Sequence, residues 1–210
     1  MARDRVRHVQ TVAWAYDKTM TANSPGGDAV CAKDALRLQV REARALRDDP
    51  AADAARTASL LALLGDAEAV ACYASLPGEP DTWAAIGALW GRGVRVLLPV
   101  LRREPDWAWY DGPEALRASF GGISEPTTDA LGASALGLAD AIVLPGLAGT
   151  PSGDRLGTGG GWYDRALAWA TPSALTLLLL DDAEVRDQVP TQPWDRPVRA
   201  IVTQSRVLWA

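Results

Sequence analysis

Short apolar runs recur along the chain and alternate with segments of helical periodicity. The apolar runs are strand-like, at 69–74, 94–100, 141–144, 175–180 and 200–202, and helical patterns at 51–64 and 81–90 flank the first of them. Strands that are buried on both faces of a parallel sheet have this composition. The pattern therefore predicts a three-layer α/β/α fold built on a mostly parallel sheet. Ligands of such sheets bind at the carboxyl ends of the strands, so we expect the turn at 76–82 and the loop that begins at Pro145 to open onto the site.

A further helix is predicted at 30–47, and it carries two distinct faces. Leu36, Val40 and Ala43 form an apolar stripe at helical spacing. A neighbouring face is basic, with residues spaced by four, four and three positions: Lys33, Arg37, Arg41 and Arg44. Such a face is either a solvated row of cations or a surface that binds an anion, and the spacing leaves both interpretations open.

The organisation of the chain is simple. Residues 1–28 mix charged residues with a short aromatic patch and have no sustained apolar period, so we expect a disordered N-terminal extension, with Met20 as a candidate start. Residues 29–210 are long enough for a single catalytic α/β domain with a substantial core. No run of about eighteen apolar residues occurs, and the N-terminus lacks the apolar segment of a signal peptide. We therefore expect a cytoplasmic monomer that does not associate with membranes.

Charge and composition exclude several classes of function. The formal net charge of −5 argues against general binding to nucleic acid or to anionic membranes. The one histidine, His8, lies in the predicted extension, which excludes catalysis by a histidine base and histidine-rich metal sites. Cys31 and Cys72 form no close pair, so neither a disulfide framework nor a zinc site is indicated. Lys33 is the single lysine after the extension, and a lone lysine among arginines is either an ordinary surface residue or a phosphate ligand.

The segment 153–165 contains the strongest chemical signal. Glycine occupies every position of 157–161 except the second, so several backbone N–H groups can surround an anion without steric hindrance. The following residues, 162–170, have helical periodicity, and a helix N-terminus favours negative charge. The loop matches neither the Walker motif nor the dinucleotide fingerprint. Flanked by Arg155 and Arg165, it is either a phosphate-binding loop or a flexible surface loop.

Further motifs occur in a fixed order between Lys33 and Gln204. They are Lys33-x3-Arg37, Gly78-Glu79-Pro80-Asp81-Thr82, Leu98-Pro99, Gly122-Ile123-Ser124-Glu125-Pro126, Leu144-Pro145-Gly146-Leu147-Ala148, the glycine-rich core from Arg155 to Arg165 with Tyr163-Asp164, and Asp195 followed by Val202-Thr203. By these motifs the chain resembles the 5-formyltetrahydrofolate cyclo-ligase family, also called methenyltetrahydrofolate synthetases. The resemblance implies that family's α/β/α fold, which is related to the folds of sugar-phosphate isomerases and CoA transferases.

The resemblance implies an ATP-dependent carbon–nitrogen ligase that closes 5-formyltetrahydrofolate to 5,10-methenyltetrahydrofolate and releases ADP and phosphate. In such enzymes the formyl oxygen attacks the γ-phosphate, N10 of the folate attacks the resulting imidoyl phosphate, and phosphate leaves. The partners are then small molecules, 5-formyltetrahydrofolate and ATP, with Mg²⁺ as the cofactor. Phosphoryl transfer depends on positioning and charge neutralisation rather than on an enzyme nucleophile, in agreement with the lack of a histidine base.

The resemblance also implies roles for individual residues. Arg155 and Glu79 would be catalytic, and Asp164 and Asp195 would bind Mg²⁺, which prefers hard oxygen ligands. The residues that bind ATP would be Lys33, Arg37, Arg155, Leu156, Gly157, Thr158, Gly159, Gly160, Gly161, Trp162 and Tyr163. The residues that bind the folate substrate would be Arg37, Ala74, Glu79, Thr158 and Trp162.

Several positions leave alternatives open. Glu79 has the alternative role of a turn carboxylate, and Asp164 that of stabilising the first turn of a helix. The chain has Gly149-Thr150 where the family has Phe-Asp, and Trp194 where bacterial members often have histidine. These departures motivate a second hypothesis, a divergent, non-catalytic paralogue that binds folate or nucleotide. A third hypothesis, a sugar-phosphate isomerase or acyl-CoA transferase on a related scaffold, has no carboxylate in the sequence that marks its catalysis.

Overall fold

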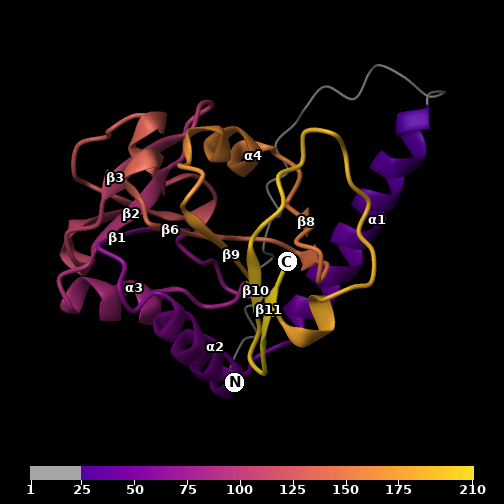
Figure 1. Ribbon diagram of the computed structural model, residues 1–210, viewed down its shortest axis with the longest axis horizontal. Helices are drawn as coiled ribbons and strands as arrows, with labels where there is room; N and C mark the ends of the chain where they lie inside the picture. The colour runs from indigo at the N-terminus through magenta and orange to yellow at the C-terminus, as the bar shows by residue number, and fades with distance from the viewer. Residues whose placement is uncertain (1–24) are drawn as a thin grey trace, which may run out of the picture.

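The computed structural model describes residues 25–210, and a seven-stranded sheet runs through its centre (Figure 1). The strand order is β11-β10-β9-β6-β1-β2-β3. The inner strands run parallel, and they are β1 (Ala69–Cys72), β2 (Arg95–Val100), β6 (Ala141–Leu144), β9 (Leu175–Leu179) and β10 (Ala200–Val202). The two edge strands are antiparallel to their neighbours, and they are β3 (Asp106–Trp109) and β11 (Val207–Trp209). The predicted α/β fold on a mostly parallel sheet is confirmed.

The apolar runs of the sequence form the inner strands, each within two residues of the expected ends. The edge strands were not predicted. In β3 the residues alternate between polar or small and aromatic, and only Trp107 is fully buried among its aromatic side chains. β11 is short and partly exposed, and the Thr203 N–H donates to Arg206 O (2.9 Å) in the turn that precedes it. Strands that are half exposed do not have the continuous apolar composition used for the prediction.

Two long helices cover one face of the sheet. They are α2 (Pro50–Leu63) and α3 (Trp83–Gly91), and they pack through Leu60 and Ile86 onto inward side chains such as Val70. α2 begins with Asp49 as its N-cap, whose carboxylate accepts from the Ala52 N–H (3.0 Å). Figure 1 shows both helices below the sheet.

Shorter helices cover the other face. Leu136 and Leu167 pack there against sheet residues such as Ile142 and Leu178. The helical elements of this layer are the 3₁₀ helix η3 (Ala133–Leu138), α4 (Trp162–Ala166) and the 3₁₀ helix η4 (Leu167–Trp169). The three predicted layers are therefore present, with one layer made of short pieces.

The first helix, α1 (Pro25–Ala45), lies to one side of these layers (Figure 1). Its apolar stripe, Leu36 and Val40, packs onto the small hairpin formed by β7 (Ala148–Gly149) and β8 (Arg155–Leu156). This hairpin carries the beginning of the glycine-rich loop, so α1 is held against the segment with the strongest chemical signal.

The predicted extension falls mostly outside the described residues, which begin at the first residue of α1. The remaining short elements are β4 (Leu116–Ala118), β5 (Ser124–Pro126), and the 3₁₀ helices η1 (Pro113–Ala115), η2 (Phe120–Gly122) and η5 (Asp182–Glu184). Within residues 25–210, no helix has the length and apolar character needed to cross a bilayer.

Candidate functional site

The glycine-rich loop connects β8 to α4. Gly159 (φ +112°) and Gly161 (φ +60°) adopt left-handed backbone conformations, which explains the choice of glycine at these two positions. The helix predicted at 162–170 is shorter than expected, because α4 ends at Ala166 and the chain continues as the 3₁₀ helix η4. A helix this short contributes a smaller dipole than the continuous helix we predicted. The short helix therefore adds little to the attraction of an anion, and the loop N–H groups and nearby side chains remain as candidate donors.

Arginines of α1 hold the loop in place. Arg37 Nε donates to Gly157 O (3.0 Å), and Arg41 Nη2 donates to Thr158 O (3.2 Å). A Cβ atom at Gly159 would lie 3.4 Å from Arg37 Cζ, so the guanidinium lies directly against the loop backbone. The Arg37 side chain is only 15% exposed. The interpretation of the basic face as a solvated row is wrong for Arg37, whereas Arg41 remains exposed.

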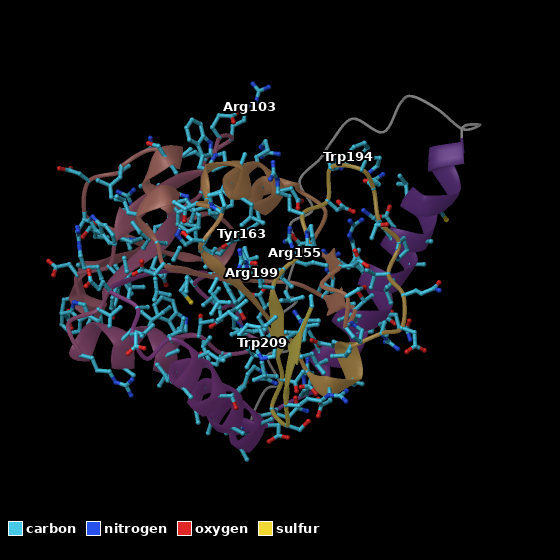
Figure 2. The ribbon with its side chains drawn as sticks, in the orientation of Figure 1. Arg103, Arg155, Tyr163, Trp194, Arg199 and Trp209 are labelled. Carbon is cyan, nitrogen blue, oxygen red and sulfur yellow. The ribbon has the colours of Figure 1, made fainter. Side chains whose placement is uncertain are left out.

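Arg155 and Asp164 form a close ion pair at the end of the loop. Arg155 Nη2 lies 2.5 Å from Asp164 Oδ1, and the Arg155 side chain is almost fully buried. Arg155 Nε is buried and has no hydrogen-bond partner among the described residues. A buried donor without a partner is unfavourable, so this N–H is suited to an acceptor supplied by a ligand. Figure 2 shows Arg155 close to the centre of the molecule, near Tyr163.

Lys33 and Asp195 form a second ion pair near the loop. Lys33 Nζ donates to Asp195 Oδ2 (2.6 Å) and lies 3.4 Å from Gln192 Oε1. The interpretation of Lys33 as an ordinary surface lysine is wrong, because the residue is only 6% exposed. Gln192 was not singled out in the sequence, where a polar residue three positions before Asp195 gives no distinctive signal.

The two carboxylates predicted to bind magnesium face the same cavity. This cavity has a volume of about 610 Å³, which is within the range of small-molecule sites. Its lining comes from the start of α4 and from the segment before β10, and it consists of Gly161, Asp164, Arg165, Pro193, Trp194, Asp195, Arg196 and Pro197. Residues about thirty positions apart in the chain are thus brought together.

The donor set of this cavity suits Mg²⁺ only in combination with a ligand. The described residues contain no group of three or more His, Cys, Asp or Glu side chains arranged for a metal ion. Asp164 and Asp195 nevertheless supply hard oxygen atoms, and Mg²⁺ commonly takes one or two protein carboxylates together with phosphate oxygens and water. The residues present therefore fit a magnesium ion that arrives with a phosphate ligand.

Glu79 closes a tight turn after β1. The Glu79 N–H donates to Leu76 O (3.0 Å), and Glu79 Oε2 accepts from the Leu76 N–H (3.0 Å). Pro77 and Gly78 (φ +86°) occupy the central positions, as in a type II turn. Burial raises the pKa of the Glu79 carboxyl, and the Leu76 N–H and the charge of Arg44 only partly offset this effect. The carboxylate does serve the turn, and its raised pKa is also typical of functional groups.

Glu79 and the magnesium candidates line different cavities. Glu79 faces a smaller space of about 120 Å³, together with Arg47, Arg56 and Asp181 among others. Tyr163 connects the two regions electrostatically, because burial and the charges of Cys72 and Glu79 raise the pKa of its phenol while Arg155 acts in the opposite direction. The structure therefore brings Gly161, Asp164 and Asp195 together at one cavity and places Glu79 at another.

Aromatic side chains pack around the start of α4. The ring of Trp162 meets those of Trp107 (centroids 5.3 Å apart) and Tyr163 (4.8 Å) edge-on, and its Nε1 donates to Arg102 O (3.2 Å). Trp162 is thus fixed in orientation. Trp107 was missed in the sequence, although the alternation of tryptophan with small residues in β3 was a usable signal. Ala74, predicted at the folate pocket, is buried directly after β1.

A buried ion-pair network lies behind the loop and was not predicted. Arg44 Nε and Nη2 donate to the two carboxylate oxygens of Glu184 (2.8 Å each), and Nη2 also donates to Gly146 O (2.7 Å). Burial alone would raise the pKa of Glu184, but the hydrogen bonds and charges of Arg44 and Arg47 outweigh it and lower the pKa. Since Gly146 begins the segment that leads into β7, this network ties α1 to the strand pair that carries Arg155.

Gly149 and Thr150, which stand where the family has Phe-Asp, are both packed closely against other residues. Thr150 is 2% exposed, and its Oγ1 donates to Asp154 Oδ2 (3.1 Å). A Cβ atom at Gly149 would lie 2.9 Å from Leu178 Cδ2 and 3.1 Å from Asp154 O, so the site has no room for a larger side chain. Neither residue lines the two cavities described above. The other predicted ATP residues follow the loop, with Leu156 in the core and Gly160 exposed.

Comparisons with known proteins agree on one family. The family model for 5-formyltetrahydrofolate cyclo-ligases matches residues 30–204. The 5-formyltetrahydrofolate cyclo-ligase of Mycolicibacterium smegmatis is 35% identical over 144 residues, which cover 65% of this chain and 74% of the relative. The enzyme of the same name from Escherichia coli K12 is 35% identical over 148 residues, which cover 67% of this chain and 80% of the relative.

Solved structures give the same result. The NMR structure of Aquifex aeolicus 5,10-methenyltetrahydrofolate synthetase matches with a TM-score of 0.74 and 26% identity, over 84% of this chain and 92% of that one. A 5,10-methenyltetrahydrofolate synthetase from Mycoplasma pneumoniae matches with a TM-score of 0.66, over 82% of this chain and 99% of that one. Its identity of 19% makes this second likeness one of fold alone.

Proposed function

The chain belongs to the 5-formyltetrahydrofolate cyclo-ligase family, and from this premise we propose that it closes 5-formyltetrahydrofolate to 5,10-methenyltetrahydrofolate while ATP is converted to ADP and phosphate. The family and the ligase class expected from the sequence motifs are confirmed by the family match and by the relatives. The observation that carries the proposal for this chain is that Asp164, which is paired with Arg155, and Asp195, which is paired with Lys33, line one cavity together with Gly161 of the glycine-rich loop.

In this proposal the nucleotide phosphates lie along the glycine-rich loop. Arg155 Nε, which has no partner within the described protein, donates to a phosphate oxygen. Arg37 already lies against the loop, and Lys33 adds a charge at its other side. These cations neutralise the negative charge that develops when the γ-phosphoryl group moves to the formyl oxygen.

The carboxylates Asp164 and Asp195 would hold Mg²⁺, which, when bound, neutralises phosphate charge and aligns the triphosphate. Asp164 keeps one oxygen on Arg155, and Asp195 keeps one on Lys33. Each carboxylate is thus oriented by a cationic side chain, which fixes the direction of the second carboxylate oxygen.

Glu79 acts at the folate side. A carboxyl group with a raised pKa retains its proton to higher pH, so it can both donate and accept hydrogen bonds. The polar ring of a pterin presents both hydrogen-bond donors and hydrogen-bond acceptors. Trp162 and Tyr163 pack against Trp107, and in this proposal their rings lie between the folate and the phosphates.

The non-catalytic paralogue was motivated by Gly149, Thr150 and Trp194. Gly149 and Thr150 are buried in the hairpin and line neither cavity, whereas Trp194 lines the larger one, so only Trp194 still motivates this alternative. The experiment that tests the proposal is a spectrophotometric assay with purified protein, ATP, Mg²⁺ and 5-formyltetrahydrofolate. A rise in the near-ultraviolet absorbance of the methenyl product is expected, and it should require ATP. No rise under these conditions would contradict the proposal.

A further inference from the structure

The segment 192–195 forms a tight turn that is locked on several sides. The Asp195 N–H donates to Gln192 O (3.0 Å), and Asp195 Oδ2 accepts from the Gln192 N–H (2.8 Å). Pro193 fixes the backbone at the second position of the turn. The buried Lys33 holds the same carboxylate oxygen from α1. The turn therefore has a defined position relative to the glycine-rich loop.

This rigid turn presents the indole of Trp194 at the cavity. Trp194 is 65% exposed, although tryptophan is a large apolar side chain that proteins usually bury. It is the one aromatic residue among those that line the 610 Å³ cavity, beside the carboxylates Asp164 and Asp195. Figure 2 shows Trp194 on the segment that runs between α1 and α4.

We propose that Trp194 is the stacking platform for the nucleobase of the nucleoside triphosphate. This inference rests on the proposed function, because it takes the phosphates to lie at the glycine-rich loop and at the two carboxylates. A ligand anchored there by its phosphates extends its base within the same cavity, and an exposed, flat indole at the cavity wall is a surface on which a base stacks. Arg196, which also lines the cavity, adds a cation beside the ring.

The pterin of the folate is the other flat ring that could stack on Trp194. The geometry favours the nucleobase, because Trp194 shares its cavity with the phosphate and magnesium candidates, whereas Glu79 faces the other cavity. A measurement that follows each ligand separately distinguishes the two assignments.

The experiment compares Trp194→Ala, Trp194→Phe and the matched control Trp209→Ala. Trp209 is similarly exposed, at 60%, but it lies in the edge strand β11 and lines neither cavity. The dissociation constant of ADP with Mg²⁺ is measured by calorimetry, and the KM values for ATP and for 5-formyltetrahydrofolate are measured by the absorbance assay. Inhibition by inorganic tripolyphosphate with Mg²⁺ reports the phosphate subsite without a base.

Trp194→Ala should weaken ADP binding and raise the KM for ATP by about 5- to 150-fold, the range expected for loss of base stacking. Trp194→Phe should retain most of the affinity, and Trp209→Ala should match the wild type. The inhibition constant of tripolyphosphate and the KM for 5-formyltetrahydrofolate should stay within about twofold of the wild type, since neither ligand touches the platform.

Unchanged ADP binding in Trp194→Ala would overturn the inference, as would an equal loss for tripolyphosphate. A rise confined to the KM for 5-formyltetrahydrofolate would assign the ring to the pterin instead. If the wild-type protein binds ADP through Trp194 but forms no methenyl product, the proposed reaction fails while the base platform stands. If the wild type turns over and Trp194→Ala has a normal KM for ATP, the proposed reaction stands while the base platform fails.

Discussion

Lys33 and Asp195, 162 positions apart in the chain, are joined by an ion pair of 2.6 Å. Their side chains are 7% and 19% exposed, so the pair is largely shielded from water. It connects the first helix to the turn at 192–195, and Asp195 lines the larger cavity. Segments far apart in the sequence therefore meet beside the glycine-rich loop.

Removing one member of this pair should affect stability and nucleotide use together. In Lys33→Ala the Asp195 carboxylate is left without its cation, and loss of one partner of a buried pair costs about 3–5 kcal/mol. The KM for ATP should rise about 10- to 100-fold, because a charge-assisted contact is lost. Urea unfolding and steady-state kinetics check the two effects. Lys33→Arg is the control and should retain part of the stability and part of the apparent affinity for ATP. A loss of stability under 1 kcal/mol in Lys33→Ala would show that the pair behaves as an exposed one.

Glu79→Gln should separate the two ligands. The variant keeps an oxygen for the Leu76 N–H but loses an ionisable group, so kcat/KM for 5-formyltetrahydrofolate should fall at least about tenfold while the KM for ATP stays within about twofold. Equal effects on both ligands would contradict the assignment of Glu79 to the folate side.

The raised pKa of Glu79 also predicts how stability depends on pH. The folded protein holds the Glu79 proton more tightly than the unfolded chain, so the contribution of Glu79 to stability is fully present below the ordinary pKa of 4.5 and is lost as pH rises through the folded value. Glu79→Gln should therefore raise the Tm relative to the wild type at pH 8, with a smaller difference at pH 4. A difference that does not change between these pH values would mean that folding does not raise the pKa of Glu79.

Glu184 should show the opposite dependence on pH. Its folded pKa is lowered, so its contribution is present above the ordinary value of 4.5 and is lost as pH falls through the folded value. Thermal unfolding of Glu184→Gln should accordingly be less sensitive to acid than that of the wild type. Arg44→Met, which leaves Glu184 buried without its bidentate partner, should lose about 3–5 kcal/mol at pH 7. A loss of similar size at pH 3 would argue against an electrostatic origin.

Gly149 is closely packed and lines neither of the two cavities. Gly149→Ala should destabilise the protein by about 1–3 kcal/mol, because its Cβ atom has no room beside Leu178 and Asp154 O. Gly87→Ala is the matched control: nothing lies within 4 Å of its added Cβ in α3, and it should stabilise by about 0.5–1 kcal/mol. The measurement is the free energy of unfolding in urea, together with the KM values. Wild-type stability of Gly149→Ala would show that the hairpin can adjust to larger side chains.

The sequence predicted the parts of the fold that depend on local composition. Continuous apolar runs identified the inner strands, and the density of glycines in 157–161 identified the loop. The edge strand with Trp107 was missed because a half-exposed strand has no such run. The sequence also could not distinguish a surface lysine from a buried one at Lys33, because burial there depends on Asp195, a residue distant in the chain. The role of Gly149 depends likewise on Leu178 and on the backbone of Asp154.

The stoichiometry of one reaction tests the central claim most directly. ADP release and methenyl absorbance are recorded together for the wild-type protein with ATP, Mg²⁺ and 5-formyltetrahydrofolate. We expect one ADP for each methenyltetrahydrofolate formed, and no ADP when 5-formyltetrahydrofolate is omitted. Methenyl product without ADP, or steady release of ADP without methenyl product, would contradict the account.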